Sequence, residues 1–258
     1  MEMASAIILG IIQGITEWLP VSSSAHLALA NHFLGMGASV EFQVALNLGT
    51  LISLIAYMRN EIWRIMQGAL KMEKKTLYLI YLIILAGIPT AIIGFAGKTF
   101  FEGMFSDVKL ISFALIITGI LLLLTKFVKR KEGKISEPSA IASGIAQGIA
   151  VAPGISRSGS TISAALLLGV SPKEAAKFSF LIGLPAFLVA SIIEIHQATS
   201  FNADFSIFAI GIIISAIVGY LSIGVLMRVL QEGKFHYFSY YCIALGLIAF
   251  ILSTFSFS

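Results

Sequence analysis

Charged residues and cysteines are both scarce in this chain. Asp, Glu, Lys and Arg together make up 12% of its 258 residues, about half of what a soluble domain carries. Hydrophobic residues make up 58%. This balance excludes a soluble globular protein. The single cysteine, Cys242, excludes an intramolecular disulfide and is interpreted as a small buried or lipid-facing side chain.

Six continuous apolar segments are long enough to cross a bilayer as α-helices. They cover residues 42–58, 77–97, 108–127, 175–195, 205–227 and 237–255. A transmembrane β-barrel is excluded because these segments do not alternate with period two. An earlier apolar stretch, residues 4–19, has no basic region before it and no small-residue cleavage site after it, so we expect it to belong to the mature protein. The predicted fold class is an all-α integral membrane protein.

The positive charges gather in alternate connections between these segments. The rich connections hold Arg59, Arg64, Lys71, Lys74, Lys75, Lys126, Lys129, Arg130, Lys131, Lys134, Lys173, Lys177, Arg228 and Lys234. The positive-inside rule places all of them in the cytoplasm. Topology and contact with anionic lipids explain these cations, so no nucleic-acid partner is expected. We therefore expect a multi-pass protein of the cell membrane with both termini outside.

A short polar pattern occurs twice and interrupts an apolar segment each time. It reads QGITEWLPVSSSAH over residues 13–26 and QGIAVAPGISRSGST over residues 147–161. The cation pattern leaves each surrounding segment beginning and ending on one side of the membrane. We therefore predict two re-entrant helical hairpins, residues 4–33 entering from outside and residues 141–169 entering from the cytoplasm.

Each hairpin with the three spans that follow it forms one half of a single membrane domain, residues 1–258. The halves cover about residues 1–127 and 139–258. Because three is odd, they are inserted upside down relative to each other, as an inverted-topology repeat. In such repeats the binding site lies where the broken segments meet, and irregular backbone at membrane depth is tolerated only inside protein or beside a wet cavity.

The polar residues of the two patterns suit phosphoryl transfer. Ser22 or Ser23 shares a helix face with His26, the arrangement of an activated nucleophile. Glu17 can orient the imidazole, act as a general base or hold a cation. Arg157 presents a planar fork to phosphate oxygens. Taken singly, a histidine or a helix-capping serine is more often structural, but such polar groups together inside a membrane indicate function.

Prolines, glycines and further hydroxyls surround these groups. Pro20 and Pro153 break the helices that precede them, and Gly154 and Gly159 allow the backbone to approach a ligand closely. A helix that begins beside Arg157 is an anion site. The candidate substrate-binding residues are Gln13, Ser22, Gly154, Ser156, Ser158 and Thr161.

These motifs resemble those of the undecaprenyl-diphosphate phosphatase family, the bacitracin-resistance membrane proteins. The likeness covers nearly the whole chain, including residues 47–50 and 178–181. It implies hydrolysis of an undecaprenyl or similar polyprenyl diphosphate to the monophosphate, which recycles the lipid carrier for cell-wall polymers. It also implies an active site that faces outside.

The resemblance carries roles to individual residues. Ser23 matches the proposed nucleophile, His26 the essential histidine, Glu17 an acidic residue of the first motif and Arg157 the phosphate-binding arginine. Attack by water or by His26 itself stays open.

The resemblance also implies a divalent cation, such as Mg²⁺ or Ca²⁺, whose ligands the sequence does not define. Gln13, Gln43 and Asn47 depart from the family pattern, with Gln13 standing where some members have glutamate. Glu17 is therefore the only carboxylate candidate for a metal, which weakens the case for a tight metal cage.

Two other classes of protein compete with the phosphatase. A transporter could use the same anion site to carry a polyprenyl phosphate across the bilayer, because inverted repeats with broken helices are a transporter architecture. A purely structural membrane protein explains none of the buried polar groups. A polyprenyl diphosphate lipid and membrane lipids are the expected partners, and a second copy of the chain is a further candidate.

Overall fold

The computed structural model describes residues 2–36, 39–128, 132–197 and 205–255, and the side chains of residues 194–197 are not described. Within these ranges the regular elements are helices, apart from a β-bridge between Gly133 and Val170. The helices are α1 (Met3–Trp18), α2 (Ser23–Leu34), α3 (Val40–Leu70), α4 (Lys74–Ala96), α5 (Lys98–Met104), α6 (Val108–Leu124), η1 (Thr125–Phe127), α7 (Glu137–Ile149), α8 (Arg157–Leu167), α9 (Pro172–Gln197), α10 (Phe205–Gln231) and α11 (Tyr237–Phe255).

Six helices are long and apolar enough to cross a membrane, namely α3, α4, α6 with η1, α9, α10 and α11. They contain the six predicted segments, except that α4 ends one residue short of the predicted boundary at residue 97, so the all-α membrane fold is confirmed. Helix α3 continues to Leu70, well past the predicted end at residue 58, and α5 was not expected. Lys129, Arg130, Lys131 and the connection at residues 198–204 lie outside the described residues.

Both repeated patterns fold as two short helices separated by a break. Helices α1 and α2 have 16 and 12 residues, and α7 and α8 have 13 and 11. Each is shorter than the ~20 residues that a membrane-spanning helix needs. Re-entrant insertion from opposite faces, and the inverted repeat that follows from it, stay predictions.

Two glycine pairs, Gly10 with Gly14 in α1 and Gly144 with Gly148 in α7, hold each broken unit against a long helix of the other half of the chain. A Cβ on Gly14 of α1 would come within 3.0 Å of backbone atoms of Ser215 and Gly219 in α10. A Cβ on Gly144 of α7 would collide with the backbone oxygen of Ala86 in α4. Small residues spaced four apart allow helices in a membrane to pack this closely. The two halves are therefore interlocked rather than stacked as separate units.

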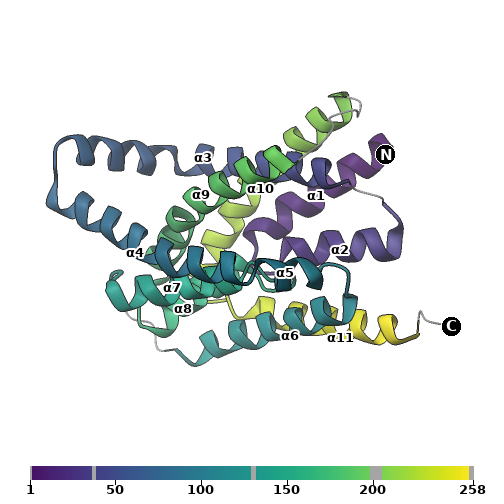
Figure 1. Cartoon of the computed structure of the whole chain (residues 1–258). Coiled ribbons are helices and arrows are strands. Elements are labelled where there is room, and N and C mark those ends of the chain that lie inside the picture. Colours follow the sequence, from purple (N-terminus) through teal and green to yellow (C-terminus); the bar gives the residue numbers. More distant parts are fainter. Residues whose placement is uncertain (1, 37–38, 129–131, 198–204, 256–258) are drawn as a thin grey trace.

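Helices α6 and α11 pack against each other along one edge of the molecule, and α3 runs along the opposite edge (Figure 1). The start of α1 and the end of α11 lie at one end, and the turn between α3 and α4 lies at the other (Figure 1). Between these edges Trp18, at the end of α1, is fully buried. Its indole Nε1 donates to Ser53 Oγ at 3.0 Å, and its ring meets that of Phe180 edge-on, with centroids 5.7 Å apart.

Candidate functional site

A cavity of about 270 Å³ lies where the two broken units approach each other. Its walls come from α1, α2, α3, α9, the connection between α5 and α6, and the connection between α7 and α8. The polar residues that line it are Gln13, Thr16, Glu17, Ser22, Ser23, Ser24, Gln43, Asn47, Ser156, Arg157 and Ser191. Most of the sequence-predicted site residues therefore share one cavity.

Local backbone chemistry places the ends of the broken helices at this cavity. Pro20 follows the end of α1, and Ser22 adopts φ 67° before α2 begins at Ser23. In the second unit Gly154 adopts φ 98°, a conformation that glycine accepts without strain. Ser156 then caps α8, its Oγ accepting from Gly159 N at 3.1 Å. Residues at the starts of both helices, among them Ser23 of α2 and Arg157 of α8, therefore line the same cavity.

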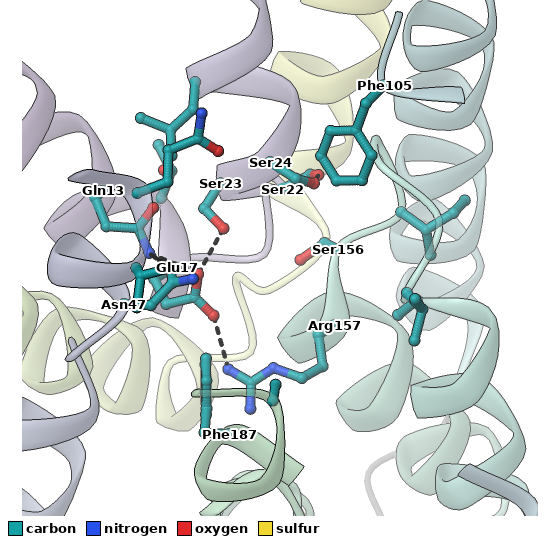
Figure 2. A pocket seen from close by; sticks show the side chains of 18 of the residues that line it. Gln13, Glu17, Ser22, Ser23, Ser24, Asn47, Phe105, Ser156, Arg157 and Phe187 are labelled. Atoms are coloured by element: carbon teal, nitrogen blue, oxygen red, sulfur yellow. Dashed lines mark hydrogen bonds and ion pairs between the residues drawn. The ribbon is translucent and has the colours of Figure 1, made fainter. Parts of the chain in front are cut away.

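The carboxylate of Glu17 is the centre of a hydrogen-bond network (Figure 2). Its Oε2 accepts from Ser23 Oγ at 2.5 Å and from Gln13 Nε2 at 3.1 Å. Its Oε1 accepts from Arg157 Nη2 at 3.0 Å. Gln13 Nε2 also donates to Asn47 Oδ1 at 3.0 Å. The network therefore joins a hydroxyl, a carboxylate and a guanidinium contributed by both halves of the chain.

Arg157 is held between aromatic rings as well as by the carboxylate. Its guanidinium carbon lies 4.0 Å from the ring centroid of Phe187 and 5.4 Å from that of Trp18. The side chains of Arg157 and Glu17 are only 16% and 10% exposed. A cation that lies over aromatic faces and is partly shielded from water is stabilised by those faces in addition to its ion pair. The guanidinium is thus positioned to bind an anion that enters the cavity.

His26 lies outside this cavity, on the side of α2 that faces α11. Its Nδ1 donates to the backbone oxygen of Ser22 at 2.8 Å, and its Nε2 lies 2.7 Å from Tyr241 Oη. The structure therefore brings Ser23 to Glu17 and not to His26. The serine–imidazole pair expected from the sequence is not among the hydrogen bonds of the described side chains, because the first turn of α2 directs the imidazole to the carbonyl of its N-cap residue, Ser22.

The hydroxyls of the second motif mostly support the connection before α8. Among them Ser156 lines the cavity. Thr161 is buried against Ser179, with 2.6 Å between the two Oγ atoms, and Ser158 Oγ lies 3.5 Å from the carbonyl oxygen of Leu19. Gly154 O accepts from Thr118 Oγ1 at 2.8 Å. Gly154, Ser158 and Thr161 therefore do not line the cavity in which Arg157 lies.

The donor set does not form a cage for a resident metal ion. Within the described ranges no cluster of three or more His, Cys, Asp or Glu side chains could hold one. Glu17 is the single carboxylate on the cavity wall, and both of its oxygens already accept hydrogen bonds. Mg²⁺ and Ca²⁺ prefer several oxygen ligands, mostly carboxylates, waters and substrate phosphates.

Four residues that hold the site were not identified from the sequence. Phe187 and Gly183 of α9 flank Arg157, Thr118 of α6 holds the connection before α8, and Tyr241 of α11 meets His26. Each lies far along the chain from the residue it contacts and belongs to an apolar span without a motif. A polar residue in the middle of an apolar span was the one available signal, and it applied to Thr118.

The fold and the site together define a multi-pass membrane protein with a serine–carboxylate–arginine network at a cavity between its two broken helix pairs. The family model of the bacitracin resistance protein BacA matches residues 6–248, and the chain belongs to this family.

Curated relatives extend over nearly all of the chain. An undecaprenyl-diphosphatase of Syntrophotalea carbinolica is 38% identical, covering 98% of this chain and 100% of the relative. One from Halothermothrix orenii is also 38% identical, over 98% and 99%. One from Methanosphaera stadtmanae is 35% identical, over 98% of this chain and 99% of the relative.

Proposed function

We propose that this protein is a membrane phosphatase that hydrolyses undecaprenyl diphosphate, or a similar polyprenyl diphosphate, to the monophosphate and inorganic phosphate. The observation that carries the proposal is the 2.5 Å hydrogen bond from Ser23 Oγ to Glu17, whose other oxygen is paired with Arg157. A poised hydroxyl, its base and a buried cation are the parts that phosphoryl transfer needs. The names of the relatives support the same reaction. Its product is the lipid carrier for cell-wall polymers, and the name of the family associates such proteins with resistance to bacitracin.

The diphosphate binds to the guanidinium of Arg157 and replaces Glu17 as its hydrogen-bond partner. In the free site this group contacts Glu17 at 3.0 Å, and an incoming phosphate offers a second, more highly charged partner. The first-turn amides of α8, which begins at Arg157, add a favourable helix terminus. Phe187 keeps the guanidinium plane in place while its partner changes. Binding of the substrate also frees Glu17 from one of its hydrogen-bond donors, which makes the carboxylate a better base.

The reaction then proceeds in two displacements. Ser23 Oγ attacks the terminal phosphorus while Glu17 takes its proton, and the bond from that phosphorus to the bridging oxygen breaks. The polyprenyl monophosphate leaves with the electron pair of that bond. Glu17 passes its proton to the departing monophosphate and is a base again. It then deprotonates the water that attacks the phosphoserine, the bond from phosphorus to Ser23 Oγ breaks with its electron pair on Oγ, and Glu17 returns the proton to that oxygen as inorganic phosphate leaves. Arg157 neutralises the charge that spreads over the phosphoryl oxygens.

A divalent cation would reach this site chiefly through the substrate. Glu17 is the single carboxylate that could contact it, and the carbonyl oxygen Oε1 of Gln13 is buried there without a described hydrogen-bond partner. Bound Mg²⁺ or Ca²⁺ would supply charge neutralisation on the diphosphate oxygens. No step above depends on it.

The membrane arrangement belongs to the same proposal. Two features support an inverted repeat: the corresponding breaks in α1–α2 and α7–α8, and the glycine pairs that pack each unit on the opposite half. The cation pattern then places both termini and the opening of the site outside. Single cysteines at Ser106 and Lys71, introduced into Cys242→Ala, test this orientation, because an impermeant thiol reagent applied to whole cells should label the first and not the second. That the chain pairs with a second copy of itself stays a prediction. Light scattering in detergent, which gives the mass of the particle, tests it.

Phosphate release from a polyprenyl diphosphate by the purified protein tests the function. We expect Ser23→Ala and Arg157→Ala to lose activity, with Ser106→Ala, an exposed serine, as the matched control. Full activity of Ser23→Ala would exclude the serine nucleophile and leave water or His26. Failure of the wild type with and without Mg²⁺ or Ca²⁺, combined with movement of the lipid head group in proteoliposomes, would replace the phosphatase by a transporter.

A further inference from the structure

The carbonyl of Ser22 lies at the most strained backbone position next to the site. Ser22 has φ 67° and ψ 97°, outside the regions that residues with a side chain favour. Such a conformation persists only where surrounding contacts hold it. Two hydrogen bonds converge on this carbonyl, one from the backbone N of His26 at 3.3 Å and one from His26 Nδ1 at 2.8 Å. One residue therefore fixes the break between α1 and α2.

The same contacts determine where the proton of His26 lies. A carbonyl oxygen only accepts hydrogen bonds, so Nδ1 carries a hydrogen. The remaining nitrogen, Nε2, lies 2.7 Å from Tyr241 Oη, and the two ring planes are 5° apart. A neutral imidazole with its proton on Nδ1 satisfies both neighbours, because the tyrosine hydroxyl donates to Nε2. Hydrogen bonding at one ring nitrogen is a general way to fix the tautomer at the other.

We propose that Tyr241 is a positioning residue for catalysis, which acts through His26 and the Ser22 carbonyl to aim Ser23 at the substrate. Tyr241 donates to Nε2 and so favours the same tautomer that the Ser22 carbonyl requires. The Nδ1 hydrogen holds the strained carbonyl, and the next residue along the chain is the nucleophile. His26 is then also a positioning residue, while Glu17, at 2.5 Å from Ser23 Oγ, takes the proton. This inference rests on the proposed phosphatase function and assigns a role to the last helix, α11.

Removal of the Tyr241 hydroxyl is the direct test. Tyr241→Phe keeps the ring against His26 and removes its hydrogen-bond donor. We expect kcat for polyprenyl diphosphate to fall about fivefold, as the loss of one neutral hydrogen bond predicts, with KM changed less than twofold. Tyr240→Phe is the matched control, because Tyr240 is the adjacent residue of α11, is 53% exposed and makes its described ring contact with Tyr237. Its activity should equal that of the wild type.

Two isosteric replacements of His26 separate positioning from proton transfer. The amide nitrogen of His26→Asn occupies the place of Nδ1 and can still donate to the Ser22 carbonyl, whereas that of His26→Gln reaches only the place of Nε2. We expect the Asn variant to retain at least tenfold more activity than the Gln variant. Neither amide can act as a base or nucleophile, so a catalytic imidazole would leave both equally inactive.

The outcomes are distinct from those that test the phosphatase itself. Wild-type activity in Tyr241→Phe, or equal inactivity of the Asn and Gln variants of His26, overturns the positioning role and leaves the phosphatase intact. A fall in Tyr240→Phe as large as that in Tyr241→Phe also overturns it, since the effect would then belong to α11 in general. Absence of phosphate release from the wild type overturns the proposed function instead.

Discussion

Replacing Gly183 of α9 with alanine tests whether Arg157 acts from the place in which it is found. A Cβ at this position would collide with Nη1 of Arg157. The guanidinium would have to retreat by roughly 1 Å or more to restore van der Waals contact. That shift breaks the alignment of its 3.0 Å bond to Glu17 and of the bonds it offers to phosphate.

The expected loss follows from the strength of such bonds. A hydrogen bond to a charged group contributes about 1.5–3 kcal/mol, so misplacing it lowers kcat/KM by about ten- to a hundredfold. The free energy of unfolding should rise rather than fall, because alanine is favoured over glycine in a helix interior by about 1 kcal/mol. A displaced guanidinium should therefore lower the activity of Gly183→Ala without lowering its melting temperature.

Phosphate release by the purified variant in detergent, followed over substrate concentration, measures this loss, and thermal unfolding measures the fold. Gly224→Ala in α10 is the matched control, since a Cβ there meets no heavy atom within 4 Å. Activity of Gly183→Ala within twofold of the wild type, alongside an inactive Arg157→Ala, would refute the reasoning, because the arginine would then tolerate displacement.

Three further changes probe the base, the connection before α8 and the helix packing. Glu17→Gln should lower kcat by at least about a hundredfold in the phosphate-release assay, as loss of a general base does, while Glu41→Gln at the start of α3 leaves it unchanged. Thr118→Val removes the hydroxyl that serves Gly154 O and Ser156 N, so we expect the free energy of unfolding to fall by about 1–3 kcal/mol in a denaturant titration, and an unchanged midpoint would contradict this. Gly144→Leu should lower the melting temperature because its Cβ meets the α4 backbone, whereas Gly224→Leu should not, and equal melting temperatures would count against the close packing.

The spans could be predicted from the sequence because bilayer thickness sets a length that apolar runs must reach. The predicted segment 237–255 coincides with α11 for this reason. The end of α3 could not be predicted in this way. Its last residues include the charged side chains of Arg59, Glu61 and Arg64, so the end of an apolar run does not mark this boundary, although Ile62 and Ile65 pack against the core.

The members of the site were predictable, whereas their pairing was not. Glu17, Ser23 and Arg157 stood out because polar groups inside an apolar segment are costly. The partner of each depends on the direction in which the backbone leaves the two breaks. The φ of 67° at Ser22 sends Ser23 toward Glu17, and the first turn of α2 returns His26 to the Ser22 carbonyl. No pattern in the sequence records that angle.

The crossed packing of the glycine pairs sets an order for the assembly of the protein during synthesis. Helix α1 leaves the ribosome well before α10, because the α10 surface that receives Gly14 follows about two hundred residues later in the sequence. Helix α7, in contrast, finds α4 already in place. The polar break between α1 and α2 therefore lacks its packing against α10 until α10 has been synthesised. The site of the enzyme can form only after that step.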